Sequence, residues 1–340
     1  MRKKIFNNVI AIVSFIVLFF IVRQYGFDEI VKNLRSVGVK IFPIIAVWLV
    51  VYLLNTVAFR IVCGKDIASR FPFRKMFALI VSSFGLNNIT PVVALGGEVY
   101  KTGVIMEYTG KTEATSIVAN YYSLHVISHT LFWMLGGAYF IVNMQMTNDY
   151  IRILITAGVF IALMFVLFNA VFRHNMIKNV YMWLCKVLKR PHSFNAKMCA
   201  KQDAVARVNS EMKNFVETRQ KEMISAVILE VFARLFSCVE IMLILDAVGM
   251  NITFGQSLFF VALSSLLLNI LFFIPMQMGS REGIYYLIMA TIGIGSDVGV
   301  FISLVTRIRE FFWIFIGLLF LPYNKLEAKK NKKIAEQEEV

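Results

Sequence analysis

The chain has 340 residues, of which 58% are hydrophobic and 16% charged, and its net charge is +14. Soluble domains average about 45–50% apolar and about 25% charged residues. The excess apolar residues are gathered in runs of about 18 or more, long enough to cross a hydrocarbon core about 30 Å thick. This composition excludes a soluble enzyme, a disordered chain and a disulfide scaffold, and it predicts an all-α polytopic membrane protein.

Six of the apolar stretches are predicted to be full membrane spans: residues 5–22, 41–62, 114–142, 153–172, 223–249 and 298–321. The first stretch follows a basic start and resembles a signal peptide. No small-residue cleavage site follows it, so we expect a permanent first helix.

Two further apolar regions, 76–94 and 254–294, are interrupted and do not look like simple spans. The first runs into Asn88-Ile89-Thr90-Pro91 and then Gly96-Gly97-Glu98, and the second is broken at 275–283. Proline, glycine and charge in an apolar stretch break helices. Such backbone is tolerated at membrane depth only where protein or a wet cavity surrounds it. We therefore predict two re-entrant hairpins, which bring the hydrophobic regions to eight.

The loops predict the orientation. Residues 173–222, 63–76 and the tail after 321 are rich in Lys and Arg, whereas 143–150 and 249–256 have none. Positive loops stay in the cytoplasm, so both termini are predicted to be cytoplasmic, in a bacterial plasma (inner) membrane. Residues 23–40 disagree, because they carry four basic residues yet lie outside in this topology.

The order of spans and hairpins predicts an inverted repeat. Each half reads span, span, hairpin, span, with opposite orientation, which is a common architecture of secondary transporters. Glu98 follows Pro91 by the same spacing as Glu282 follows Pro275. The predicted membrane domain covers residues 1–322, with half one at 1–142, half two at 151–322 and a cytosolic insertion at 173–222. Residues 323–340 are predicted to be a charged, disordered cytosolic tail.

Charged residues inside apolar segments are the most informative, since each costs about 2.5–3.5 kcal/mol at a helix centre. They must pair or reach water. Glu230 and Arg234 are four positions apart and Arg307 and Glu310 three, so each couple is predicted to pair on one helix face. The alternative is that such pairs only tie helices together. The full set is Glu98, Glu230, Arg234, Glu240, Arg281, Glu282, Arg307, Arg309 and Glu310.

The broken segments are the predicted substrate site. A helix that restarts near Ser280, or at Thr90-Pro91, exposes backbone N–H groups that favour an anion, and a lipid phosphate is the obvious anion there. The carboxylates of Glu98 and Glu282 could balance arginines, relay protons or meet a cationic part of a headgroup. The candidate residues are Asn87, Asn88, Pro91, Gly97, Glu98, Pro275, Gly279, Arg281, Glu282, Arg307, Arg309 and Glu310.

Other chemistry has little support. His125 and His129 are four positions apart, a spacing that can bind metal or titrate near neutral pH. No third ligand is visible, so a hydrogen-bonded structural pair is the favoured interpretation. There is no Walker A loop and no nucleophile–base pattern. We predict no catalytic residue, no cofactor and no metal, and a protein that is not an enzyme.

At both broken segments the sequence resembles the flippase-like transmembrane family of lysylphosphatidylglycerol synthases. The likeness covers about residues 5–321. The motifs are Asn88-Ile89-Thr90-Pro91 with Gly96-Gly97-Glu98-Val99-Tyr100-Lys101, and Ile274-Pro275 with Gly279-Ser280-Arg281-Glu282-Gly283, Ile292-Gly293-Ile294, Arg307 and Gly317.

The resemblance implies a lipid-translocase-like fold with two re-entrant hairpins. The best-known members move an aminoacylated phospholipid between leaflets, and others are linked to hopanoid or lipid-linked sugar pathways. The soluble aminoacyl-transferase domain of full-length relatives is not present, so this chain is expected not to make the lipid. Asn120-Tyr121-Tyr122 stands where an acid–arginine pair is expected, which leaves the headgroup open.

Three functions follow as hypotheses. The leading one is a translocase that binds a phospholipid or lipid-linked sugar in a central cavity lined by Asn88, Glu98, Arg281, Glu282, Arg307 and Arg309. The second is a membrane partner that holds the substrate of a separate glycosyl- or aminoacyl-transferase. The third is a secondary transporter of an ion or small solute. Nucleic acid is not an expected partner.

Overall fold

The computed structural model describes residues 35–89, 96–143, 158, 202–271, 277 and 279–338, with the side chains of 202–205 and 322–338 left out. Within these residues every regular element is helical. The elements are η1 (Gly38–Lys40), α3 (Ile41–Cys63), α4 (Lys65–Arg70), α5 (Phe73–Ile89), α6 (Gly96–Ile105), α7 (Lys111–Asn143), α11 (Gln202–Thr218), α12 (Gln220–Ala247), α13 (Phe254–Ile270), α14 (Ser280–Ile292) and α15 (Ser296–Glu338).

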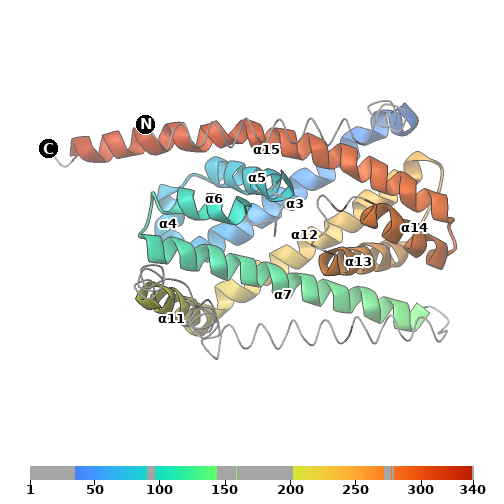
Figure 1. The fold of residues 1–340 in the computed structure, drawn as a ribbon, viewed down its shortest axis with the longest axis horizontal. Coiled ribbons are helices and arrows are strands. Elements are labelled where there is room, and N and C mark those ends of the chain that lie inside the picture. The colour runs from blue at the N-terminus through green and yellow to red at the C-terminus, as the bar shows by residue number, and fades with distance from the viewer. Residues whose placement is uncertain are drawn as a thin grey trace, which may run out of the picture.

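The longest helices frame the molecule. Helix α15 runs along one long side, α7 runs along the opposite side, and α3 and α12 cross the space between them (Figure 1). The short pair α5 and α6 lies toward one end, and the short pair α13 and α14 lies toward the other. The two interrupted segments therefore occupy opposite ends of the described bundle.

Helices α3 and α12 are antiparallel partners at the centre. Their contact is extensive. At one end the Arg219 guanidinium, which precedes α12, donates to the carbonyls of Ile61 and Val62 near the end of α3. At the other end Lys40, just before α3, pairs with Asp246 at 2.9 Å. The end of α3 thus lies beside the start of α12, and the start of α3 beside the end of α12.

Each outer helix packs against a short helix of the other half through a glycine. On α7, a Cβ at Gly136 would overlap Ala262 of α13, and on α15, a Cβ at Gly317 would overlap the carbonyl of Val81 on α5. Small residues let helices approach this closely, as in many membrane proteins. The same number of positions separates Val81 from Ala262 as separates Gly136 from Gly317.

Apolar packing fills the two ends of the bundle separately. One cluster surrounds Phe59, Met76 and Leu79 near α5 and α6. A second surrounds Ile244, Phe260 and Met289 near α13 and α14. The described fold thus has a core around each interrupted segment, and α3 and α12 run through both.

The predicted helices and breaks agree well with the described elements. Stretches 41–62, 114–142 and 223–249 appear as α3, α7 and α12. Helix α5 ends at Ile89 and α6 begins at Gly96, while α13 ends at Ile270 and α14 begins at Ser280, as predicted for the second restart. The restart predicted at Thr90-Pro91 lies outside the described residues, as do the stretches 5–22 and 153–172.

The all-helical fold is consistent with a membrane protein. Among the described helices, Arg35–Cys63 and Lys111–Asn143 are long and apolar enough to cross a membrane by length and composition. Helices α12 and α15 are long too, but each carries several charged residues within its apolar stretch. The predicted number of spans, the re-entrant hairpins and the inverted repeat stay predictions at this point.

The prediction of a disordered tail was wrong. The backbone of α15 continues as a helix to Glu338. The tail sequence is rich in Lys, Glu and Ala, which are good helix formers even where they are charged and solvated. High charge therefore did not exclude regular structure, because the tail extends a helix that is already nucleated.

Candidate functional site

The break between α13 and α14 is conformationally unusual. Gln277 has a φ of 54°, the one positive φ among described non-glycine residues, and Gly279 before α14 has a φ of 73°. Glycine adopts this region easily, whereas glutamine does so at a cost. Such backbone persists where its surroundings hold it, and it is concentrated at functional sites.

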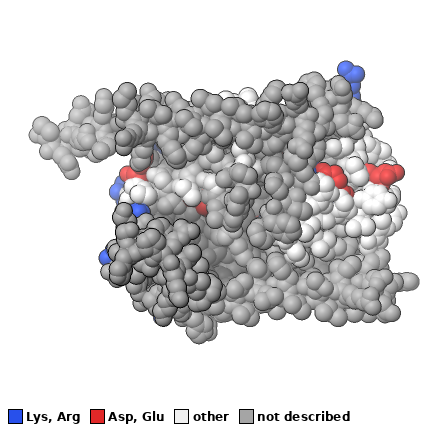
Figure 2. Space-filling model, in the orientation of Figure 1, with Lys and Arg blue, Asp and Glu red and all other residues white. Residues whose placement is uncertain are grey.

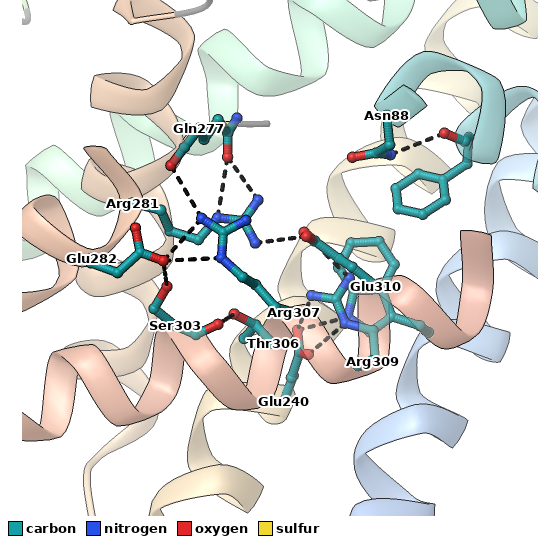
Figure 3. Close-up of polar contacts among 12 residues, drawn as sticks. Asn88, Glu240, Gln277, Arg281, Glu282, Ser303, Thr306, Arg307, Arg309 and Glu310 are labelled. Carbon is teal, nitrogen blue, oxygen red and sulfur yellow. Dashed lines mark hydrogen bonds and ion pairs between the residues drawn. The ribbon is translucent and has the colours of Figure 1, made fainter. Parts of the chain in front are cut away.

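Two buried arginines hold Gln277 in place. The guanidinium of Arg281 donates to the side-chain Oε1 of Gln277 from Nε at 3.2 Å and from Nη2 at 2.7 Å. Arg307 donates from Nη2 to the backbone carbonyl of the same residue at 3.2 Å. Figure 3 shows both guanidiniums lying side by side beneath Gln277. The side chain of Gln277 is thus held by Arg281, and its backbone carbonyl is held by Arg307.

Each of these arginines also pairs with a glutamate. Arg307, which is 2% exposed, donates from Nε and Nη2 to Oε1 of Glu282, both at 2.9 Å. Arg281 contacts Glu310 at 2.7 Å. The close ion-pair partners of Arg307 and Glu310 are thus on the facing helix α14, Glu282 for Arg307 and Arg281 for Glu310.

Arg309 completes the network on the other side of Glu310. It pairs with Glu240 of α12 at 2.8 and 3.2 Å, and its Nη1 lies 3.9 Å from Glu310. Its guanidinium lies 3.8 Å from the ring centroid of Trp48, whose Nε1 donates to Glu240 at 2.6 Å. Helices α3, α12, α14 and α15 therefore meet at one buried polar network.

The charges of this network balance. Arg281, Arg307 and Arg309 are matched by glutamates 240, 282 and 310. Isolated ions would be very costly here, so the pairing explains how the charges are tolerated. Oε2 of Glu282 is buried without a hydrogen-bond partner among the described residues. Nη1 of Arg309 likewise has no hydrogen-bond partner among these residues, so two atoms of the network are left for a further contact.

The break between α5 and α6 holds a second, smaller group. Oδ1 of Asn87 accepts from the backbone N–H of Gly97 at 2.7 Å, and its Nδ2 lies 3.5 Å from Glu98. Glu98 pairs with Lys101 at 2.9 Å. A Cβ at Gly97 would overlap the carbonyl of Ser83, so a glycine is needed where α6 approaches α5. The buried ammonium of Lys101 also lies 4.8 Å from the Tyr121 ring centroid.

The two breaks do not form one polar cluster within the described residues. Within the described residues, Asn87 and Glu98 contact each other, Gly97 and Lys101, all of which are on α5 and α6. Asn88 donates to the carbonyl of Phe84 on its own helix at 2.9 Å, and Figure 3 shows it on a separate helix from the arginines. Pro91 and Pro275 lie outside the described residues. A single cavity lined by both sets stays a prediction.

A third polar group joins α7 to α12. Glu230, 1% exposed, accepts from Tyr121 at 2.6 Å, lies 2.8 Å from Nδ1 of His125 and pairs with Arg234 at 3.6 Å. The predicted Glu230–Arg234 pair is therefore confirmed. His125 and His129 contact through their rings, with centroids 5.0 Å apart, but the hydrogen-bond partner of His125 is Glu230 rather than the second histidine.

An apolar groove of about 550 Å³ lies elsewhere, between α3, α5 and the middle of α15. It is lined by Leu53, Phe77, Leu319 and Phe320, with Arg74 at its edge. None of the charged residues of the networks lines it. The groove therefore says nothing about the predicted central cavity.

Several residues of these groups were absent from the predicted site. Gln277 lies within the predicted break but is uncharged, Lys101 is three positions after Glu98, and Glu240 was noted as a buried charge without a role. The i,i+3 spacing could have indicated Lys101. Trp48 and Tyr121 offer no such signal, because ordinary aromatic residues of a span have the same pattern.

Comparison with known proteins supports a lipid-related family. Residues 8–317 match the family model described as the lysylphosphatidylglycerol synthase TM region. The chain is also similar to a UPF0104 membrane protein of Methanocaldococcus jannaschii, with 21% identity over 339 residues that cover 96% of this chain and 97% of the relative. No solved structure matches the chain.

Proposed function

Because the chain belongs to the lysylphosphatidylglycerol synthase TM region family of membrane proteins, we propose that it moves a polar lipid between the leaflets of the bacterial inner membrane. The headgroup binds at the break between α13 and α14, and the chain acts by transport rather than by catalysis. The slow step of unaided lipid movement is desolvation of the headgroup, since burying a charge without partners is costly. A protein speeds it by offering replacement contacts.

The observation that carries the proposal is the strained Gln277 held between Arg281 and Arg307 at an interrupted helix. Two fork-shaped guanidiniums at one point are the usual protein partners of a phosphate. The adjacent start of α14 supplies backbone N–H groups, which also favour an anion. A headgroup phosphate that enters here exchanges contacts with Gln277 and the glutamates.

The balance of charges favours a headgroup that carries both signs. Each arginine of the network already has a carboxylate partner, so a bare anion would have to displace one of them. A headgroup with a phosphate and an amine would replace both halves of an ion pair, the phosphate at Arg307 and the amine at Glu282. Zwitterionic and aminoacylated phospholipids have this chemistry.

The packing supports the inverted repeat that this mechanism uses. The contacts of α3 with α5 and of α5 with α6 have counterparts in α12 with α13 and α13 with α14. The contact of α5 with α15 has its counterpart in α13 with α7. Helices α3 and α12 pack antiparallel on each other, as two related elements do when they lie next to an in-plane two-fold axis. Rocking of one half against the other then provides alternating access.

The proposed orientation is also supported by where the charged segments lie. Helices α4 and α11 and the end of α15 are at the same end of the molecule in Figure 1, and all three were assigned to the cytosol by their loops. In the view of Figure 2, the described Lys and Arg side chains gather mainly at that end. The α5–α6 hairpin then enters from the cytosol and α13–α14 enters from outside.

The test is lipid movement in reconstituted vesicles. Phosphatidylethanolamine–phosphatidylglycerol vesicles would carry trace amounts of fluorescent phosphatidylglycerol, phosphatidylethanolamine or lysylphosphatidylglycerol. A membrane-impermeant quencher then reports exchange between leaflets. We expect faster exchange than in empty vesicles for the lipids with an amine, and about tenfold or greater loss in the Arg281→Ala and Glu282→Gln variants, for a charge-assisted hydrogen bond worth about 1.5–3 kcal/mol.

The matched control is Lys213→Ala. Lys213 pairs with Glu217 at 3.7 Å on the exposed face of α11, far from the breaks, so its variant should match the wild type. Equal rates for wild-type and empty vesicles with all three lipids would refute the proposal. If Arg281→Ala and Glu282→Gln both move lipid as fast as the wild type, the headgroup does not bind at the α13–α14 break.

A further inference from the structure

The contact between His125 and Glu230 joins the two halves of the chain. His125 is on α7, in the first half, and Glu230 is on α12, in the second. Their atoms Nδ1 and Oε2 are 2.8 Å apart. The side chain of Glu230 is 1% exposed whereas that of His125 is 34% exposed. One partner can thus reach the surroundings while the other cannot.

The surrounding hydrogen bonds assign the proton positions. A carboxylate only accepts, so the hydrogen on Nδ1 of His125 points at Glu230. Nη2 of Arg234 lies 3.3 Å from Nδ1 and 3.4 Å from Nε2, so the guanidinium stands over the face of the ring. The imidazole thus lies between an anion and a cation. The Tyr121 hydroxyl donates to the other carboxylate oxygen at 2.6 Å.

The charged and titratable neighbours of the pair are on α6, α7 and α12. Helix α12 contributes Arg234, and α6 contributes Lys101, which is paired with Glu98 at 2.9 Å. Helix α7 adds His129, whose ring contacts that of His125, and its buried Nδ1 has no hydrogen-bond partner. With a neutral His125 these charges sum to zero.

The remaining neighbours bring no charge to the pair. Helix α3 presents Phe59 to Tyr121, α13 presents Ser265 to Trp133, and α11 contacts α7 at Ser116. Helix α15 meets α12 at Glu240, which is already paired with Arg309. A proton added to the site therefore changes its net charge from zero to one positive charge.

We infer that His125 and Glu230 together bind one proton at the contact between the two halves of the protein. Water delivers the proton to Nε2 of His125, where a new N–H bond forms. Nδ1 keeps its own hydrogen on the 2.8 Å contact to Oε2 of Glu230. The result is an imidazolium paired with the Glu230 carboxylate, so one proton has entered and none is lost.

The step changes the contact between the halves. Arg234 now has a second cation, the imidazolium, at 3.3 and 3.4 Å from its Nη2, and shares the Glu230 carboxylate with it. Two cations on one buried carboxylate are unfavourable, so the arrangement of α7 on α12 is destabilised until the proton leaves. A proton gradient can in this way drive the rocking of the halves. This coupling rests on the proposed lipid movement, whereas proton binding does not.

Proton binding is tested first, on the purified full chain in phospholipid nanodiscs. Weakly buffered protein is brought from about pH 8 to pH 5, across the range in which imidazole titrates, and the protons taken up are measured with a pH dye. We expect the wild type to bind one proton more than either His125→Gln or Glu230→Gln. The double variant should lose the same single proton, because the two residues share it.

Ser128→Ala is the matched control. Ser128 accepts from Arg234 in the same cluster but does not titrate, so its variant should bind as many protons as the wild type. Uptake by the single variants equal to that of the wild type, or loss of two protons in the double variant, would overturn the inference. If either variant fails to fold, infrared difference spectra of wild-type protein with isotope-labelled histidine replace it. Absence of a histidine protonation change over this pH range would then refute the site.

Coupling is tested with the fluorescent lipids in vesicles that carry a pH gradient. We expect the wild type and Ser128→Ala to move lipid several-fold faster with the gradient in one direction than without it, and Glu230→Gln to lose this response. Wild-type movement that ignores the gradient would overturn the coupling and leave lipid translocation intact. If the protein binds the shared proton but moves no lipid, the proton site is upheld and the proposed function is refuted.

Discussion

Arg309 and Glu240 form a two-point ion pair, at 2.8 and 3.2 Å, in which both residues are almost completely buried. Trp48 covers the pair, with its ring against the guanidinium and its N–H on the carboxylate. Glu240 and Arg309 belong to the second half and Trp48 to the first. The pair therefore lies at the contact between the two halves. We expect its removal to lower the stability of the whole protein.

We expect Arg309→Leu to destabilise the protein by about 3–5 kcal/mol, because it leaves a buried carboxylate without its cation. The double variant Arg309→Leu with Glu240→Leu should recover much of that loss, since no uncompensated charge is left. Recovery should be partial, because Trp48 still loses its acceptor. Thermal unfolding of detergent-solubilised protein, followed by intrinsic fluorescence, measures both.

The exposed pair of Lys40 and Asp246 is the control for this experiment. Its atoms are as close, at 2.9 Å, but the side chains are 47% and 56% exposed. Exposed pairs contribute about 0–1 kcal/mol, so Lys40→Ala should change the unfolding midpoint little. Equal effects of Lys40→Ala and Arg309→Leu would contradict the structure at this point.

Neighbouring glycines on α7 give a second test. A Cβ at Gly136 would overlap that of Ala262 on α13, whereas nothing lies within 4 Å of a Cβ at Gly137. Gly136→Ala should therefore lower stability by about 1–3 kcal/mol through overpacking. Gly137→Ala should raise it by up to about 1 kcal/mol, because alanine is the better helix former. Unfolding midpoints of the two variants should move in opposite directions.

The pairing of α7 with α13 can be checked by rescue. In the double variant Gly136→Ala with Ala262→Gly, the methyl group moves from one helix to the other and the overlap disappears. The double variant should be more stable than Gly136→Ala alone, despite the cost of about 1 kcal/mol for a glycine within α13. A double variant less stable than both single ones would mean that these positions do not face each other.

Arg307 offers a test of geometry at constant charge. It uses two nitrogens on Glu282 and one of these on the Gln277 carbonyl, a fork that lysine lacks. Arg307→Lys should keep the fold but slow lipid exchange by about tenfold or more, as for a lost charge-assisted hydrogen bond of about 1.5–3 kcal/mol. Unaltered exchange in a folded Arg307→Lys protein would exclude a role for the fork.

Much of the helical framework follows from local sequence signals. Pro275 and Gly279, with charges in an apolar stretch, predict the break that ends α13 at Ile270 and starts α14 at Ser280. The Glu230–Arg234 pair follows from i,i+4 spacing on one helix. These features could be predicted because the partners are near in the chain and the helix geometry is known beforehand.

The partners of the other charges could not be predicted in this way. Arg307 prefers Glu282 on another helix to Glu310 on its own, and Trp48 joins Glu240 across the two halves. Such choices depend on how whole helices are packed, which no spacing encodes. The strain at Gln277 is also invisible in sequence, because it results from two arginines that converge only after folding.

The ion pair of Lys101 and Glu98 predicts unusual chemical protection of a lysine. Lys101 is 4% exposed, is paired at 2.9 Å and lies over the Tyr121 ring, whereas Lys111 is exposed on α7. Acylating reagents need an accessible, neutral amine, so mass spectrometry should find Lys111 labelled and Lys101 unlabelled. In Glu98→Gln the ammonium loses its charged partner, and labelling of Lys101 should rise about tenfold or more, for a contact worth about 1.5–3 kcal/mol. Glu113→Gln, at the start of α7, is the control and should leave Lys101 protected. Rapid labelling of Lys101 in the wild type would mean that the α5–α6 break is open.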